Sequence, residues 1–140
     1  MRLSLPLSTV HYRLLAGMWT AGIVVALSLP AESFGAAQPE MGADKIAHVV
    51  LFAGFGALWL RGLCPPAACD PARCFWWRGG LFFVAGALFA VGTELYQPLL
   101  PVQRIADPYD AAADLVGVML AFVGYYVYHV RPARRPPPES

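Results

Sequence analysis

Eight polar side chains lie within or beside long apolar stretches of this 140-residue chain, and their types and spacing could support binding or acid–base chemistry. They are Asp44, Lys45, His48, Glu94, Gln97, Arg104, Asp110 and Asp114. Within each stretch the spacing is mostly three or four residues, which places the members on one face of a helix. These eight residues are the candidate ligand-binding set.

The residue types allow several kinds of chemistry. Lys45 and Arg104 could hold a phosphate, one as a point charge and the other as a planar fork. His48, Glu94 and Asp110 are the candidate catalytic residues, because imidazole and carboxyl groups can act as acids and bases. The acids and the imidazole could instead ligate a divalent metal, although no dedicated metal site is predicted and the sequence does not identify a cofactor. No Ser or Cys lies near the set in sequence, which argues against a covalent mechanism.

Each residue also has a structural interpretation. Asp44 suits the beginning of a helix, where a carboxylate accepts from free backbone amides. His48 lies one turn into an apolar segment, where it could bind a ligand or form a hydrogen bond across helices. Glu94 should be paired, protonated or directed into a wet cavity, because an isolated carboxylate in a membrane is costly. Sequence alone leaves binding, catalysis and structural pairing open.

The elements that must position these residues are membrane helices. The chain is 58% hydrophobic and 14% charged, with a mean hydropathy of +0.53, which is too apolar for a soluble domain. Four stretches approach the roughly 20 apolar residues that a membrane helix needs, at 12–29, 45–63, 79–97 and 111–130. We predict an all-α bundle of four short transmembrane helices over residues 12–130, with a cytoplasmic segment at 1–11 and a disordered, basic, Pro-rich tail at 131–140.

The distribution of charge predicts the orientation of this bundle. Eight of the ten Lys and Arg residues fall at the termini and between the second and third helices: Arg2, Arg13, Arg61, Arg73, Arg78, Arg131, Arg134 and Arg135. By the positive-inside rule both termini are cytoplasmic, and most of the acids lie at the outer face. The first apolar stretch has some features of a signal peptide, but its length favours a retained helix. A multi-pass protein with no nucleic-acid partner is expected.

Three cysteines, Cys64, Cys69 and Cys74, lie in the predicted cytoplasmic loop. Their even spacing lacks the paired CxxC pattern of a zinc site. A reducing cytoplasm favours free thiols over disulfides.

Four short motifs resemble the VanZ-like family of small bacterial membrane proteins, which is named for a protein associated with teicoplanin resistance. They are DKIAH from Asp44, ELYQ from Glu94, PVQR ending at Arg104, and DAAADLVG, which runs from Asp110 to Gly117. The resemblance covers residues 44–124. Two departures stand out: Val102 and Gln103 replace a common Pro-Gly before the arginine, and Asp114 stands where many relatives have Asn.

The resemblance implies a bacterial inner-membrane protein that binds an envelope lipid or glycopolymer headgroup and affects susceptibility to teicoplanin-type glycopeptides. A membrane-embedded enzyme acting on a lipid-linked phosphate or envelope polymer is one alternative. The other is a structural charge network that binds no ligand. Convergence of the candidate residues around an open pocket would favour the first two alternatives, whereas tight mutual pairing would favour the third.

Overall fold

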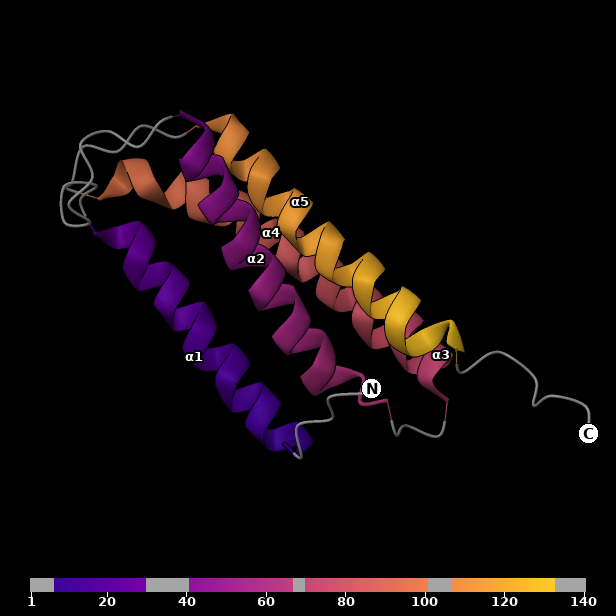
Figure 1. The fold of residues 1–140 in the computed structure, drawn as a ribbon. Helices are drawn as coiled ribbons and strands as arrows, with labels where there is room; N and C mark the ends of the chain where they lie inside the picture. Colours follow the sequence, from indigo (N-terminus) through magenta and orange to yellow (C-terminus); the bar gives the residue numbers. More distant parts are fainter. Residues whose placement is uncertain (1–6, 30–40, 67–69, 101–106, 133–140) are drawn as a thin grey trace, which may run out of the picture.

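The computed structural model describes residues 7–29, 41–66, 70–100 and 107–132, and the described part is an all-α bundle without strands (Figure 1). The long helices are α1 (Thr9–Ser28), α2 (Met41–Leu63), α4 (Gly80–Tyr96) and α5 (Pro108–Tyr125). The short helix α3 (Pro71–Cys74) and the π-helical turn η2 (Phe75–Gly79) run directly into α4. The 3-10 turn η3 (Gln97–Leu99) ends this third span, and the π-helical turn η4 (Tyr126–Val130) extends α5.

The prediction of four membrane helices is confirmed. Four helical spans are long and apolar enough to cross a membrane: Thr9–Ser28, Gly42–Leu63, Pro71–Leu99 and Pro108–Val130. Large apolar side chains on their outer faces, such as Leu81, Leu88 and Leu95, are well exposed. Exposed apolar surface of this extent suits contact with lipid rather than water. The chain is therefore a multi-pass membrane protein.

All four helical spans begin earlier than the apolar stretches predict, the first at Thr9 rather than residue 12 and the second at Met41 rather than residue 45. The third span begins at Pro71 rather than near residue 79, and the fourth at Pro108 rather than near residue 111; these two beginnings share a sequence signal. In both cases an aspartate precedes a proline, and its side chain caps the helix by accepting a hydrogen bond from a backbone N–H. Proline is favourable at the first helical position because its missing N–H would have no helical partner there.

The bundle is built around α2, which packs most extensively against α5 and also contacts α1 and α4. At the centre of this packing, rings of Phe52, Phe55 and Phe89 lie with their centroids 5.2–5.9 Å apart. Helix α1 lies to one side of α2 (Figure 1) and is joined to it by polar contacts. Trp19 donates its indole N–H to the carbonyl of Leu51 at 2.9 Å, and Arg13 donates to the carbonyl of Gly62 at 2.9 Å.

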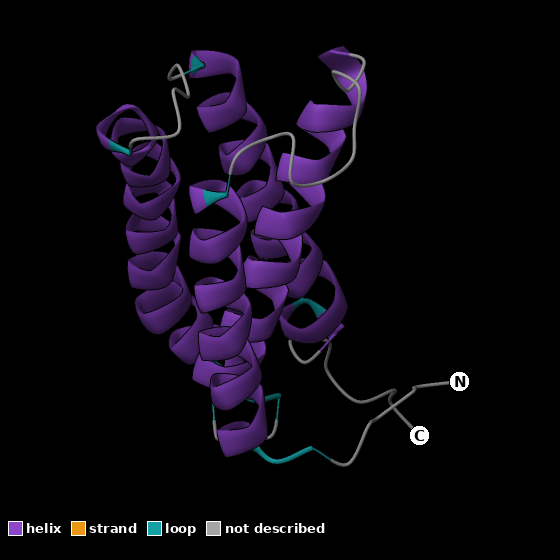
Figure 2. Ribbon diagram, turned by 90° about the vertical axis from the view of Figure 1, so that its left-hand side faces the viewer, coloured by secondary structure: helices purple, strands orange, loops and turns teal. Residues whose placement is uncertain are grey.

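The two ends of the bundle are formed by different helix ends, and the cysteines lie at one of them. Helix α1 begins and η4 ends at one end of the bundle, whereas α2 and α5 begin at the other (Figure 1). Figure 2 shows the same bundle of helices from the side. The cysteine segment lies at the first of these ends, where Cys64 and Cys74 are free thiols. Cys69 and most of the predicted tail lie outside the described residues. The beginning of α1 and the end of η4, which are the described elements nearest to the two ends of the chain, thus lie at the same end of the bundle.

Candidate functional site

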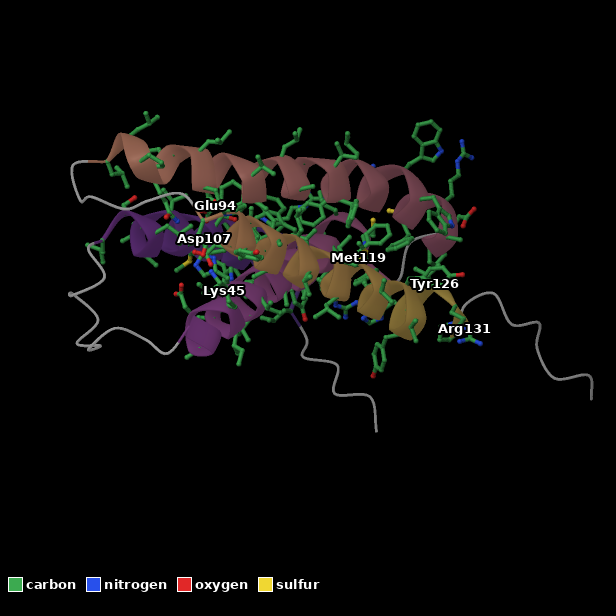
Figure 3. All side chains as sticks on the ribbon, turned by 90° about the horizontal axis from the view of Figure 1, so that it is seen from above. Lys45, Glu94, Asp107, Met119, Tyr126 and Arg131 are labelled. Atoms are coloured by element: carbon green, nitrogen blue, oxygen red, sulfur yellow. The ribbon has the colours of Figure 1, made fainter. Side chains whose placement is uncertain are left out.

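Three helix ends meet at the end of the bundle that is opposite to the beginning of α1. They are the beginnings of α2 and α5 and the end of α4, and the labelled side chains Lys45, Glu94 and Asp107 gather there (Figure 3). We call the group formed by Asp44, Lys45, His48, Glu94, Gln97, Asp107, Asp110 and Asp114 the polar cluster. It brings together residues that are up to 70 positions apart in the sequence.

Local sequence fixes each of these helix ends. Asp107 caps α5 by accepting a hydrogen bond from the backbone N–H of Tyr109 at 2.9 Å, and Pro108 follows at the first helical position. Asp44 and Asp110 are the acidic residues in the first turns of α2 and α5. Carboxylates are favoured there because they face the positive ends of the helix dipoles.

Lys45 ties the beginning of α2 to the beginning of α5. Its ammonium group donates to Oδ2 of Asp107 at 2.6 Å and also contacts Oδ1 of Asp110 closely. The hydrogen bond from Lys45 lowers the pKa of the Asp107 carboxyl below its ordinary value. Asp107 is therefore ionised over the whole neutral range and holds Lys45 within the cluster.

His48 links the same two helices one turn deeper. Its Nδ1 lies 2.9 Å from Oδ1 of Asp114, and its Nε2 lies 3.9 Å from Oδ2 of Asp110. The His48 side chain is 7% exposed and that of Asp114 is fully buried. The second carboxylate oxygen of Asp114 has no hydrogen-bond partner in the described part of the chain. Such a buried, unsatisfied acceptor is rare in proteins and needs a physical explanation.

Glu94 joins the end of α4 to the cluster. One of its carboxylate oxygens accepts from the side-chain amide of Gln97 at 3.3 Å, and the other accepts from the backbone N–H of Asp107 at 3.2 Å. Both Glu94 and Gln97 are buried. Both donors to Glu94 in the described residues are neutral, and Arg104, one of the cations with which it could pair, lies outside them.

A close approach of α2 and α5 sets the distance between His48 and Asp114. A Cβ atom added at Gly117 would lie 2.5 Å from the carbonyl oxygen of Val49 and 2.9 Å from the backbone nitrogen of Ala53. No side chain fits there without moving one of the two helices. Gly117 is three residues after Asp114 and therefore lies on the same face of α5.

The charges of the polar cluster do not balance. Five carboxyl groups, on Asp44, Glu94, Asp107, Asp110 and Asp114, face one lysine and one histidine. Two overlapping groups of three have ligand atoms close enough to hold a metal ion, all within 4.8 Å of one another. One group is Asp44, His48 and Asp110, and the other is His48, Glu94 and Asp114. The described part of the cluster therefore favours cations and hydrogen-bond donors over anions.

Seven of the eight candidate residues lie in the polar cluster, and Arg104 lies outside the described residues. Sequence reasoning did not select Asp107 as a candidate, although it contacts Lys45, caps α5 and places its N–H on Glu94. The Asp-Pro pair is the signal that could have identified it, because this pair is typical of a capped helix beginning.

A cavity of about 820 Å³ lies away from the polar cluster, between α1, α2 and α4. Its lining is mainly apolar and includes Phe55, Trp59 and Phe89, with Arg13 and Arg78 as its charged residues. This cavity does not include any residue of the polar cluster.

Comparisons of the chain with models of protein families, with curated proteins and with solved structures gave no match.

Proposed function

We propose that this chain is a VanZ-like protein of the bacterial inner membrane, whose polar cluster binds the headgroup of an envelope lipid or glycopolymer. The order and spacing of the four motifs support the family. The convergence of motif residues from three helices supports a shared role for them.

The excess of acceptors in the polar cluster is the observation that carries this proposal. The buried Oδ2 of Asp114 has no partner in the described residues, and five carboxyl groups share few donors. Hydroxyl, amide and ammonium groups of a headgroup would supply donors to these oxygens. Lys45 is already paired with two carboxylates, so a phosphate would have to compete for it or use Arg104.

The charge distribution adds an orientation to the proposal. With both termini in the cytoplasm, the polar cluster faces outward and meets the outer leaflet. A protein that covers headgroups there would lower the access of teicoplanin-type glycopeptides to their targets. This effect on susceptibility rests on the family resemblance alone.

Headgroup binding can be measured with the purified full chain in lipid nanodiscs. The probes are a polyprenyl-diphosphate-linked glycan and, for comparison, phosphatidylglycerol. We expect His48→Ala and Glu94→Gln to weaken glycan binding at least about tenfold, the cost of losing one or two buried hydrogen bonds. The matched controls His11→Ala and Asp70→Asn change exposed residues outside the cluster and should bind normally. Equal binding by all four variants would refute the proposal.

The same variants, together with Arg104→Lys, can be compared in cells for membrane abundance and teicoplanin susceptibility. Loss of phenotype at normal abundance would support a working site. Loss of abundance in every cluster variant would instead support the structural network. The pairing of Lys45 with Asp107 and Asp110, and of His48 with Asp114, is the observation that favours this second candidate.

A catalytic role is the remaining alternative. The His48–Asp114 pair favours it, because a carboxylate at 2.9 Å orients an imidazole as a carboxylate does in general-base catalysis. The chemistry would be proton transfer on a lipid-linked phosphate or envelope polymer, with Glu94 and Asp110 as the other acid–base groups. Turnover of the glycan probe in the binding assay would identify this activity.

A further inference from the structure

His48 is held between two aspartates of α5 in a way that leaves one ring nitrogen unused. Nδ1 is bonded to Asp114 at 2.9 Å, whereas Nε2 lies 3.9 Å from Oδ2 of Asp110. This second distance is too long for a hydrogen bond. In the described part of the chain Nε2 has no hydrogen-bond partner, although the side chain is more than nine-tenths buried.

The 3.9 Å separation of Nε2 and Oδ2 is close to that of two ligands of one metal ion. Imidazole nitrogens and carboxylate oxygens bind Zn²⁺ at about 2.0–2.2 Å in tetrahedral geometry, which places two ligand atoms about 3.3–3.6 Å apart. The carboxylate of Asp44 completes a group whose ligand atoms all lie within 4.8 Å of one another. Side-chain shifts of roughly half an ångström each would close this group around an ion.

The remaining contacts of these residues match the outer contacts of known metal sites. A metal-binding histidine usually donates its other ring N–H to a carboxylate, which fixes its tautomer and orientation. Asp114 supplies that carboxylate to His48. Asp110 contacts Lys45 through Oδ1, which leaves Oδ2 facing the imidazole.

The cluster also needs positive charge at this depth. Asp114 is fully buried, and one of its oxygens lacks a partner in the described residues. An ion on Nε2 would place a positive charge across the imidazole ring from this carboxylate, which is bonded to Nδ1. Glu94 is a weaker candidate ligand than Asp44, because both of its oxygens already accept hydrogen bonds.

We propose that His48, Asp110 and Asp44 bind a divalent transition-metal ion, with Asp114 as the residue that positions His48. One imidazole and two carboxylates suit Zn²⁺ or Mn²⁺ better than Cu⁺, which prefers sulfur, or Ca²⁺, which prefers oxygen alone. Three protein ligands leave at least one coordination position open. Asp44 is half-buried, so it places the ion next to the surface at this end of the bundle.

Metal binding can be tested on the full chain in detergent, purified with an affinity tag that contains no histidine. After treatment with a chelator, the protein is titrated with Co²⁺ and followed by visible absorption, and Zn²⁺ and Mn²⁺ are then used as competitors. We expect one ion per chain by elemental analysis. His48→Ala should abolish binding, and Asp114→Asn should weaken it about 10–100-fold, as outer ligands do elsewhere.

Asp44→Asn keeps the test valid if His48→Ala fails to fold. The Asp44 side chain makes no hydrogen bond or ion pair within the described residues, so its replacement should leave helix content and elution volume unchanged. We expect it to weaken Co²⁺ binding at least about tenfold. The control variants His11→Ala and Asp70→Asn should bind like the original chain.

The absence of a stoichiometric ion from the original chain would overturn the metal site. Unchanged affinity in both Asp44→Asn and His48→Ala would also overturn it. The titration uses no headgroup, so its failure is distinct from failure of the proposed glycan binding.

Discussion

Substitution of Gly117 by alanine should separate α2 from α5 and disrupt the polar cluster. The added Cβ would lie 2.5 Å from the carbonyl oxygen of Val49, and ordinary contact begins at 3.4 Å. The difference between these distances requires a displacement of about 0.9 Å. If α5 moves as a rigid body, the 2.9 Å distance between His48 and Asp114 grows to about 3.8 Å, beyond hydrogen-bond length.

We expect Gly117→Ala to lower the free energy of unfolding by about 1–3 kcal/mol, which is typical of overpacking. Gly124→Ala is the matched control on the same helix, because an added Cβ there meets no atom within 4 Å. The control should be neutral or up to about 1 kcal/mol more stable, since alanine favours a helix over glycine. Reversible unfolding in mixed micelles, followed by tryptophan fluorescence, measures both variants.

Equal stability of the two glycine variants would refute this reasoning. It would mean that α2 and α5 do not approach as closely as the structure shows. A second check is metal or headgroup binding, which Gly117→Ala should weaken without changing any residue of the polar cluster.

Three further predictions concern single contacts. Asp107→Ala should lose about 1 kcal/mol of stability relative to Asp107→Asn, because asparagine can still cap α5; the same unfolding assay would show equal values if the cap were unimportant. Burial raises the pKa of the Cys64 thiol to about 12, which leaves little of the reactive thiolate at pH 8. In a variant with Cys64 as its single cysteine, reaction with maleimide at pH 8 should therefore be roughly a thousandfold slower in the folded protein than in protein unfolded in dodecyl sulfate. Trp19→Phe should destabilise the contact with Leu51 by about 1 kcal/mol, whereas Trp77→Phe, at a position 76% exposed, should have no effect.

The four helices could be predicted because the length of an apolar stretch reports how much chain lies in the hydrocarbon core. Their beginnings could not be read from the same signal. Asp70-Pro71 and Asp107-Pro108 begin helices outside the most apolar residues, and capping there depends on hydrogen bonds rather than hydropathy. A search for Asp-Pro pairs beside apolar stretches would have moved both beginnings to their observed positions.

Every member of the polar cluster except Asp107 could be selected from the sequence, but the partner of each residue could not. Helical spacing places Asp44 with His48 and Asp110 with Asp114 on shared faces. It does not determine which helices are neighbours, and so it could not pair Lys45 with Asp107 and Asp110 or give Glu94 neutral donors. The contact at Gly117 supplies that information, because it fixes which faces of α2 and α5 meet.

Depth within the cluster determines where a cation is needed. Asp44 and Asp110 lie in the first turns of α2 and α5, where free backbone amides and the helix dipoles stabilise a carboxylate. That stabilisation falls off within one turn. Asp114 lies one turn deeper and is fully buried, so its charge depends on what His48 carries. A proton or a metal ion on Nε2 of His48 would each supply that charge, but a metal ion would also occupy the space between Nε2 and Asp110. The Co²⁺ titration therefore addresses the structure of the cluster as well as its function.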